Sequence, residues 1–566
     1  MHRTPIAALL AVLLGACASV APPPAPQPVP PHPAAAAVSL PAPRPSAPAP
    51  APAAAPTAAP AAPYGPAVMA RFPDPAVRYA TPAFEPGHAA FTSNAELQAQ
   101  LRELVREAKA AGSRAQLLVA GVSQTGQPIE ALLLSRQADL EPAALRASGR
   151  TTVLLIGQQH GDEPAGAEAL LALAHSLAQG SLAPRLDGLN VIVLPRANPD
   201  GAQAGRRATA SGIDLNRDHL LLRTPEAQAI AGLMRDYAPA VVVDAHEYPA
   251  VAPYLDKFGG VARADALLQY AMAPNVHEFV SRAAEEWFRR PLLERLQREG
   301  LTSDWYHTLA TAPDDRRVAM GAPRPDLGRN AAGLHHAVSL LVETRGSELG
   351  RTHFARRVHT QVVAMESVLA SAAARADDLA KLRRFVETET VAQACSGETV
   401  VEAASTPSEY LLKLIDPASG ADMAVNVAWD SALQLQTLRA RARPCGYWLA
   451  AGERDAALRL RGLGLTVQRI EEQGVVRGES YRETARAAVA DSPGALQPQV
   501  ETVPALLDVA PGSWYVPLDQ PLAGLAIAAL EPDTPVSYVT QGVIAGGVHA
   551  VSRVLARPGF RLGTLP

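Results

Sequence analysis

Cysteine is scarce in this chain of 566 residues, which contains only Cys17, Cys395 and Cys445. Three cysteines exclude a disulfide-built scaffold and are too few for a zinc site made of thiolates. Charged residues make up 19% of the chain and the net charge is −4, which gives no electrostatic case for binding nucleic acid. The sequence also lacks a His-Glu-x-x-His segment, so a helical zinc site of that type is excluded.

The N-terminus has the pattern of a targeting segment. Two polar residues, His2 and Arg3, precede an apolar run over residues 6–14, which is too short to span a bilayer as a mature helix. The run ends in Leu-Gly-Ala-Cys17, which resembles a bacterial lipoprotein signal with Cys17 as the lipidated residue. We therefore expect a signal peptide at 1–16 and an anchored lipoprotein on the periplasmic face of a membrane. Ala18 favours the outer membrane, and an ordinary signal peptide is the alternative.

The rest of the chain divides by composition into three parts. Residues 17–70 are rich in Pro and Ala and contain almost no charge, which predicts an extended tether without a core. A hydrophobic fraction of 48% over the whole chain indicates globular domains after it. We expect a catalytic domain at 71–382 and a smaller C-terminal domain at 383–566.

Apolar strands and helical segments alternate through the predicted catalytic domain. This alternation predicts an α/β fold with a mixed, mainly parallel sheet and helices on both faces. The expected strands are 115–122, 129–135, 151–156, 189–194, 240–243 and 337–342. The expected helices are 97–111, 165–177, 225–237 and a long closing helix at 352–382.

The first candidate metal ligands follow the strand at 151–156. The strand ends at Gly157, and His160-Gly-Asp-Glu163 stands between it and the next helix. Imidazole and carboxylate are both zinc ligands, and a turn between strand and helix can direct both at one point. A solvated turn is the alternative, because a His and a Glu three positions apart are common on loops.

Two later strands end in further candidates. The strand at 240–243 leads to Asp244-Ala-His246-Glu247, and the strand at 337–342 leads to Glu343. His246 supplies a third ligand, and three protein ligands with one open position are typical of a catalytic zinc. Asp244 or Glu247 is expected to orient a ligand histidine, with simple solvation as the alternative. Glu343 is the candidate general base.

Five segments together resemble the zinc carboxypeptidase family. They are His160-Gly-Asp-Glu163, Asn198-Pro-Asp-Gly201, Gly212-Ile-Asp-Leu-Asn216-Arg217, Val243-Asp-Ala-His246 and Leu341-Val-Glu343-Thr, in the family's order. The resemblance implies an eight-stranded mixed sheet between helices, with the site at the strand ends. It also implies a Zn²⁺ cofactor and hydrolysis of peptide bonds.

The resemblance assigns a role to each matching residue. The zinc ligands are His160, Glu163 and His246, and the general base is Glu343. Arg207 matches the arginine that polarises the scissile carbonyl, with the adjacent Arg206 as the alternative. Asn216 and Arg217 match the pair that binds the substrate's terminal carboxylate, a task suited to a planar guanidinium. Surface ion pairing is the alternative for both arginines.

The chain departs from the family's pattern before Glu343. Many members have a substrate-capping tyrosine there, but residues 315–334 contain none. Tyr306 is the aromatic alternative, and Arg329 is expected to contact an acidic or carboxylate group of the substrate. Residues 248–338 are therefore expected to set specificity, and strict exopeptidase action stays open.

The C-terminal part, 383–566, predicts a smaller α+β or β-rich domain, with strand-like stretches at 513–517 and 536–539. In an oxidising periplasm Cys395 and Cys445 are expected to form a disulfide, and two free thiols are the alternative.

The leading hypothesis is a lipid-anchored zinc metallopeptidase acting on peptides in the cell envelope. An amidase of peptidoglycan stem peptides or of acylated amino acids is the alternative, with a muropeptide as its substrate. A peptide-binding module without catalytic activity is a second alternative. No nucleic acid partner is expected.

Overall fold

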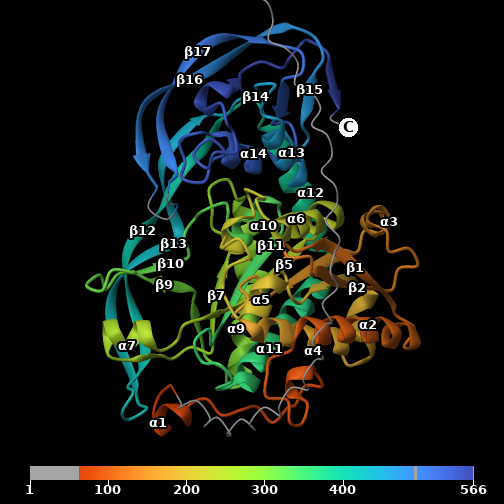
Figure 1. The fold of residues 1–566 in the computed structure, drawn as a ribbon, viewed down its shortest axis with the longest axis vertical. Helices are drawn as coiled ribbons and strands as arrows, with labels where there is room; N and C mark the ends of the chain where they lie inside the picture. The colour runs from red at the N-terminus through yellow and green to blue at the C-terminus, as the bar shows by residue number, and fades with distance from the viewer. Residues whose placement is uncertain (1–62, 490–491, 493, 565–566) are drawn as a thin grey trace, which may run out of the picture. The chain divides into compact units, whose positions relative to one another are not determined.

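The computed structural model describes residues 63–489, 492 and 494–564. The predicted signal peptide, Cys17 and nearly all of the predicted tether lie outside the described residues. Packing begins earlier than the predicted boundary at residue 71. Helix α1 (Pro66–Met69) is formed, and Tyr64 and Val68 are 8% and 0% exposed because they join the main hydrophobic core. Figure 1 shows the chain coloured from the N-terminus to the C-terminus.

An eight-stranded sheet forms the centre of the catalytic part, in the order β1-β2-β4-β3-β5-β11-β7-β8. Four neighbouring strands, β4, β3, β5 and β11, are parallel, as is the edge pair β7 and β8, and the other pairs are antiparallel. The predicted mixed, mainly parallel sheet is confirmed. The strands are β1 (Arg114–Val122), β2 (Pro128–Ser135), β3 (Thr151–Gly157), β4 (Leu189–Leu194), β5 (Val241–Tyr248), β7 (Ala266–Tyr270), β8 (Ser303–Trp305) and β11 (Val338–Arg345).

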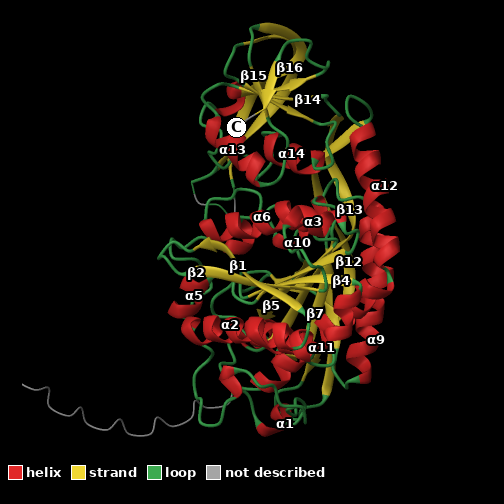
Figure 2. Ribbon diagram, turned by 90° about the vertical axis from the view of Figure 1, so that its right-hand side faces the viewer, coloured by secondary structure: helices red, strands yellow, loops and turns green. Residues whose placement is uncertain are grey.

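Helices cover both faces of this sheet (Figure 2). One hydrophobic core includes α2 (Asn94–Ala110), α4 (Pro164–Gln179) and α11 (Phe354–Ala374), and a second includes α6 (Pro225–Tyr237) and α10 (Gly328–Leu334). Strands β3 and β4 are buried along their whole length because helices lie on both sides of them. The other helices of this part are α3 (Pro142–Ala147), α5 (Pro199–Ala204), α7 (Ala252–Phe258), α8 (Glu278–Ala283) and α9 (Arg290–Arg298).

The predicted ends of two strands and the extent of one helix were wrong. Strands β5 and β11 do not end before their polar residues, because their parallel pairing continues through Glu343 opposite His246. The long helix predicted over 352–382 is two helices, α11 and α12 (Ala376–Ala392), which are separated at Arg375 by non-helical backbone. The predicted domain boundary at residue 382 therefore falls inside α12. Among the described residues, no helix combines the length and hydrophobicity needed to cross a bilayer.

A second sheet joins the catalytic part to the C-terminal part. Its strand order is β6-β12-β13-β10-β9, and a long antiparallel hairpin, β12 with β13, forms its middle. Strand β13 pairs with β10 of the catalytic part, where Val318 is opposite Trp429. The hairpin therefore extends a sheet that begins in the catalytic part. The strands are β6 (Val261–Ala262), β9 (His307–Leu309), β10 (Val318–Met320), β12 (Glu398–Ile415) and β13 (Asp422–Ala442).

The C-terminal part contains a third sheet, which is antiparallel throughout and has the order β17-β16-β19-β14-β18-β15-β20. The predicted strand at 513–517 corresponds to β18, but the one at 536–539 was wrong. That segment is a turn whose buried Tyr538 hydroxyl donates to the Leu220 carbonyl at 3.0 Å. The elements are β14 (Gly446–Leu449), α13 (Arg454–Gly462), β15 (Gln468–Ile470), β16 (Gly474–Ala488), β17 (Leu496–Val509), β18 (Trp514–Pro517), α14 (Ala523–Leu530), β19 (Val551–Val554) and β20 (Leu562–Thr564).

A disulfide between Cys395 and Cys445 closes a loop between the end of α12 and β14, with the two Cα atoms 4.1 Å apart. The closed loop includes the whole β12–β13 hairpin. Replacing both cysteines with serine is expected to lower the free energy of unfolding by about 4 kcal/mol, because the open chain gains entropy when unfolded. Urea unfolding of the unreduced protein and of the double variant measures the difference. Identical midpoints and slopes would contradict the expectation.

Candidate metal and substrate site

Three buried side chains converge where β3 and β5 lie side by side. His160 and Glu163 belong to the turn between β3 and α4, and His246 is on β5. Nδ1 of His160 is 2.8 Å from one Glu163 oxygen, and Nδ1 of His246 is 2.9 Å from the other. The two Nδ1 atoms are 3.0 Å apart. This is the group of acidic and histidine side chains, within the described residues, whose ligand atoms lie close enough to hold a metal ion.

Carboxylates on the outer side orient both histidine rings. Nε2 of His160 is 3.0 Å from Asp214, and Nε2 of His246 is 2.8 Å from Asp244. A proton held on each Nε2 leaves both Nδ1 atoms free to bind a metal. The sequence predicted Asp244 or Glu247 for this role. Glu247 instead accepts from the Ala165 backbone and is bound by Arg357.

The electrostatics of these groups suit a divalent cation. Burial disfavours a charge on His246, but the carboxylates of Asp244 and Glu163 raise its pKa well above the usual value. Burial also disfavours the Glu163 carboxylate, yet the two histidines hold its pKa well below the usual value. Positive charge is therefore strongly favoured between these residues. Two imidazoles and one carboxylate are the donor set of a catalytic zinc site.

Gly161 and Gly201 allow the ligand turn to pack closely against the neighbouring segment. A Cβ on Gly161 would lie 1.9 Å from the Gly201 carbonyl carbon, so the turn and the first residues of α5 cross in backbone contact. Asn198 holds the crossing together. Its side chain accepts from the Gly201 amide at 2.9 Å and donates to the carbonyls of Gln159 at 3.1 Å and Arg207 at 3.3 Å. The Asn198-Pro-Asp-Gly201 motif therefore supports the site without facing the substrate.

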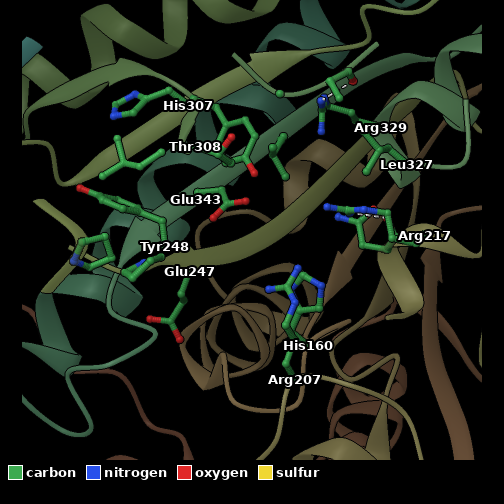
Figure 3. Close-up of a pocket in the computed structure, with 18 of the residues that line it drawn as sticks. His160, Arg207, Arg217, Glu247, Tyr248, His307, Thr308, Leu327, Arg329 and Glu343 are labelled. Carbon is green, nitrogen blue, oxygen red and sulfur yellow. Dashed lines mark hydrogen bonds between the residues drawn. The ribbon is translucent and has the colours of Figure 1, made fainter. Parts of the chain in front are cut away.

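Glu343 lies beside the metal ligands on the next strand. The parallel register of β11 and β5 places it opposite His246, and it lines a cavity of about 410 Å³ together with His160 (Figure 3). The side chain is 8% exposed. Burial raises the pKa of Glu343 to about 7, so this carboxyl group can take up and release a proton near neutral pH.

Arg207 is the arginine that reaches the metal ligands. Its guanidinium lies 3.4 Å from Glu163 and 3.0 Å from Asp214, and its side chain is half exposed to the cavity. The neighbouring Arg206 binds the Ala210 carbonyl outside the site instead. Of the two candidates that the sequence left open, Arg207 is the one that lies beside the metal ligands.

Asn216 and Arg217 line the same cavity. The Asn216 side chain accepts from the Gly328 amide at 2.8 Å, which fixes its orientation between the 3₁₀ turn Leu215–Arg217 and α10. Arg217 donates to the Asn216 carbonyl at 2.8 Å, and its guanidinium faces the cavity in Figure 3. Arg329 of α10 and Tyr306 also line this cavity.

Asp214 is a site residue that the sequence reasoning missed. It stands two positions before Asn216 in a motif that was already recognised, and it contacts both His160 and Arg207. Burial opposes its charge, but His160 and Arg207 hold the pKa of Asp214 well below the usual value. Its signal in the sequence is its place inside that motif, because Asp214 is 54 positions from His160 along the chain.

The fold and the site define a metal-dependent hydrolase of the α/β type. Residues 101–257 match the family model for zinc carboxypeptidase. Over 409 residues the chain is 29% identical to carboxypeptidase 2 of Trichophyton rubrum. The aligned region covers 70% of this chain and 75% of the relative. Over 135 residues it is 33% identical to murein peptide amidase A of Escherichia coli, which covers 19% of this chain and 51% of the relative.

Solved structures give weaker overall matches. A metallo-carboxypeptidase from Pseudomonas aeruginosa aligns with a TM-score of 0.35 and 19% identity, over 49% of this chain and 68% of that chain. Carboxypeptidase A from Helicoverpa armigera aligns with a TM-score of 0.36 and 15% identity, over 51% and 75%. The stretch that matches the zinc carboxypeptidase model contains His160, Glu163 and His246, which are the zinc ligands.

Proposed function

We propose that this zinc carboxypeptidase removes C-terminal residues from peptides in a bacterial cell envelope. The observation that carries the proposal is the single cavity that Glu343, Arg207 and Arg217 share with the ligand His160. A base, a carbonyl-polarising cation and a carboxylate-binding cation are thereby available to one substrate. Each is needed at a different atom of a C-terminal peptide bond.

The roles of the side chains follow from their positions. When zinc is bound, it polarises the scissile carbonyl and makes water more acidic. Glu343 then removes a proton from the attacking water and delivers it to the leaving amine. Arg207, beside the metal ligands, donates to the carbonyl oxygen as negative charge develops on it. Arg217 and Asn216 bind the terminal carboxylate, which aligns the last peptide bond with Glu343.

Two features support a location in the envelope. The sequence over residues 1–16 has the pattern of a lipoprotein signal, with Cys17 as the residue to be lipidated. The disulfide between Cys395 and Cys445 suits an oxidising compartment such as the periplasm. The proposal places the enzyme on the periplasmic face of a membrane, with the outer membrane favoured by Ala18. Labelling of expressing cells with a radioactive lipid precursor tests it, and an unlabelled mature protein would contradict the anchor.

An amidase of peptidoglycan peptides is the second candidate, favoured by the match to murein peptide amidase A. Mass spectrometry after incubation with linear peptides and with muropeptides distinguishes the two. We expect single residues to be released from peptide C-termini, and a zinc chelator to stop this release. Cleavage of muropeptides without release of C-terminal residues would favour the amidase, and no cleavage of either would contradict both.

The pH dependence of the reaction is expected to report on Glu343. Burial raises the pKa of Glu343 to about 7, and the positive charge of bound zinc lowers it again. Because the base acts as the carboxylate, kcat/KM is expected to fall tenfold per pH unit on the acid side. The pH at which kcat/KM is half maximal should lie between about 4.3, the ordinary pKa of glutamate, and about 7. A profile that stays flat from pH 8 to pH 4 would exclude Glu343 as the base.

A further inference from the structure

The cavity contains a buried arginine that has no acidic partner. Arg329 is 3% exposed, and its Nη2 donates to the Ala322 carbonyl at 3.2 Å. Its Nε is buried without a hydrogen-bond partner, and no carboxylate among the described residues forms an ion pair with it. The guanidinium carbon lies 5.6 Å from the centre of the Tyr306 ring. Arg329 therefore carries a charge that the folded chain itself leaves largely uncompensated.

The surrounding chain is built to keep Arg329 in this position. A Cβ on Gly321 would lie 2.2 Å from Nη2 of Arg329, so only glycine leaves room for the guanidinium. The Gln269 side chain fixes Gly321. It accepts from the Gly321 amide at 3.1 Å and donates to the Gly321 carbonyl at 3.3 Å. Asn330 holds the same loop by donating to the carbonyls of Ala322 at 3.1 Å and Arg324 at 2.8 Å.

A buried and unpaired cation is costly, and an anion that enters the cavity recovers that cost. The other cations of the cavity have partners or assigned roles. Arg207 is bound to Glu163 and Asp214, and Arg324 is bound to Asp326. Arg217 is available for the terminal carboxylate. Arg329 is therefore left to bind a second negative group on the same substrate, in the cavity that it lines with Arg217 (Figure 3).

We propose that the enzyme prefers peptides whose C-terminal residue is glutamate or aspartate. Arg217 and Asn216 bind the main-chain carboxylate, and Arg329 binds the side-chain carboxylate. The inference rests on the proposed carboxypeptidase function and names its substrate class. Of the twenty standard residues, only these two bring a second carboxylate into the cavity.

Matched peptides that differ only in the last residue test the proposal. We expect kcat/KM for a C-terminal Glu peptide to exceed that of the Gln peptide by about 100-fold or more, because Gln lacks the charge but has the same shape. The Asp and Asn pair should show the same direction. Equal or faster release of Gln, Leu or Lys would overturn the preference and leave the carboxypeptidase function intact. Absence of any release would instead contradict the proposed function.

Replacing Arg329 with Gln then tests the residue. The Glu peptide should lose about 100-fold in kcat/KM, while the Gln peptide changes little. If both peptides lost equally, Arg329 would bind the main-chain carboxylate and the assignment would be wrong. Arg329→Lys keeps the charge and should retain a preference for Glu. This variant tests the assignment if Arg329→Gln does not fold. Zinc content and Tm of each variant show whether the site is intact.

Gly321→Ala is an independent test that leaves Arg329 in the sequence. The added methyl group has to displace the guanidinium, so the preference for Glu over Gln should shrink toward that of Arg329→Gln. Gly452→Ala is the matched control, because a Cβ at Gly452 meets nothing within 4 Å. A Gly321→Ala variant with the full wild-type preference would contradict the role of Gly321 in placing Arg329.

Discussion

Glu343→Gln is expected to lower kcat by a factor of about 10³ to 10⁴ while zinc remains bound. Glutamine has the size of glutamate but cannot accept a proton from water, and Glu343 lines the cavity directly opposite the ligand His246 in the sheet. KM should change little, because Arg217 and Arg329 still bind the substrate. The acid side of the pH profile should disappear from any activity that remains.

Zinc analysis and turnover measurements on one preparation check this expectation. Glu366→Gln is a suitable control, because Glu366 is a partly exposed carboxylate on α11 that pairs with Arg295. That variant should keep wild-type kcat. Turnover above about a tenth of wild type in Glu343→Gln would fall well short of the usual contribution of a general base and would remove Glu343 from the role.

Glu163→Gln is expected to abolish activity for a different reason, which is loss of the metal. Removing a group that only orients a ligand lowers metal affinity by about 10 to 100-fold. Losing the charge of a ligand should therefore lower the zinc affinity by more than about 100-fold. Glu163 is the one acidic member of the ligand group, so the two imidazoles left in the variant attract a cation much less strongly. Activity should return in part at high zinc concentration.

Competition with a chromogenic chelator measures the zinc affinity of wild type and variant. Asp162→Asn is the matched control, since Asp162 is next in sequence but is no member of the metal-binding group. It should bind zinc like wild type. Equal zinc affinity in Glu163→Gln and wild type would mean that Glu163 is not a ligand.

The central sheet could be predicted because its strands carry their own signal. Buried parallel strands read as continuous apolar runs, and β3 and β4 are buried at every position. Helix α6 was equally clear, since Thr224 caps its first turn and Pro225 begins it. The ends of β5 and β11 were placed too early because Asp244 and Glu343 are charged, although a metal site can bury charged residues inside a strand.

The supporting shell of the site was harder to read than the ligands. The ligands lie on a buried strand or directly after one, whereas Asp214 and Arg207 reach His160 and Glu163 from a loop. The burial of Arg329 has no local signal at all, because it depends on Gly321, which is on a different segment. Local periodicity contains no information about such contacts between distant segments.

The long hairpin of β12 and β13 was missed for a related reason. Its strands are half exposed, and shifts of register between Val400 and Glu402 and between Ser405 and Thr406 interrupt the alternation of polar and apolar residues. Part of its pairing is with β10, more than 100 residues earlier in the chain. Pairing over such a separation is set by the tertiary structure and not by neighbouring residues.

Strand β10 has a consequence for how this enzyme can be shortened. It ends at Met320, directly before the Gly321 loop, and it is paired on one side with β13 and on the other with β9. The sulfur of Met320 accepts from the Ala432 amide on β13 at 3.4 Å. A version of the chain cut after α12 would leave β10 as an exposed edge strand beside the substrate cavity. We therefore expect that a shortened enzyme keeps its substrate selectivity only if it includes the β12–β13 hairpin.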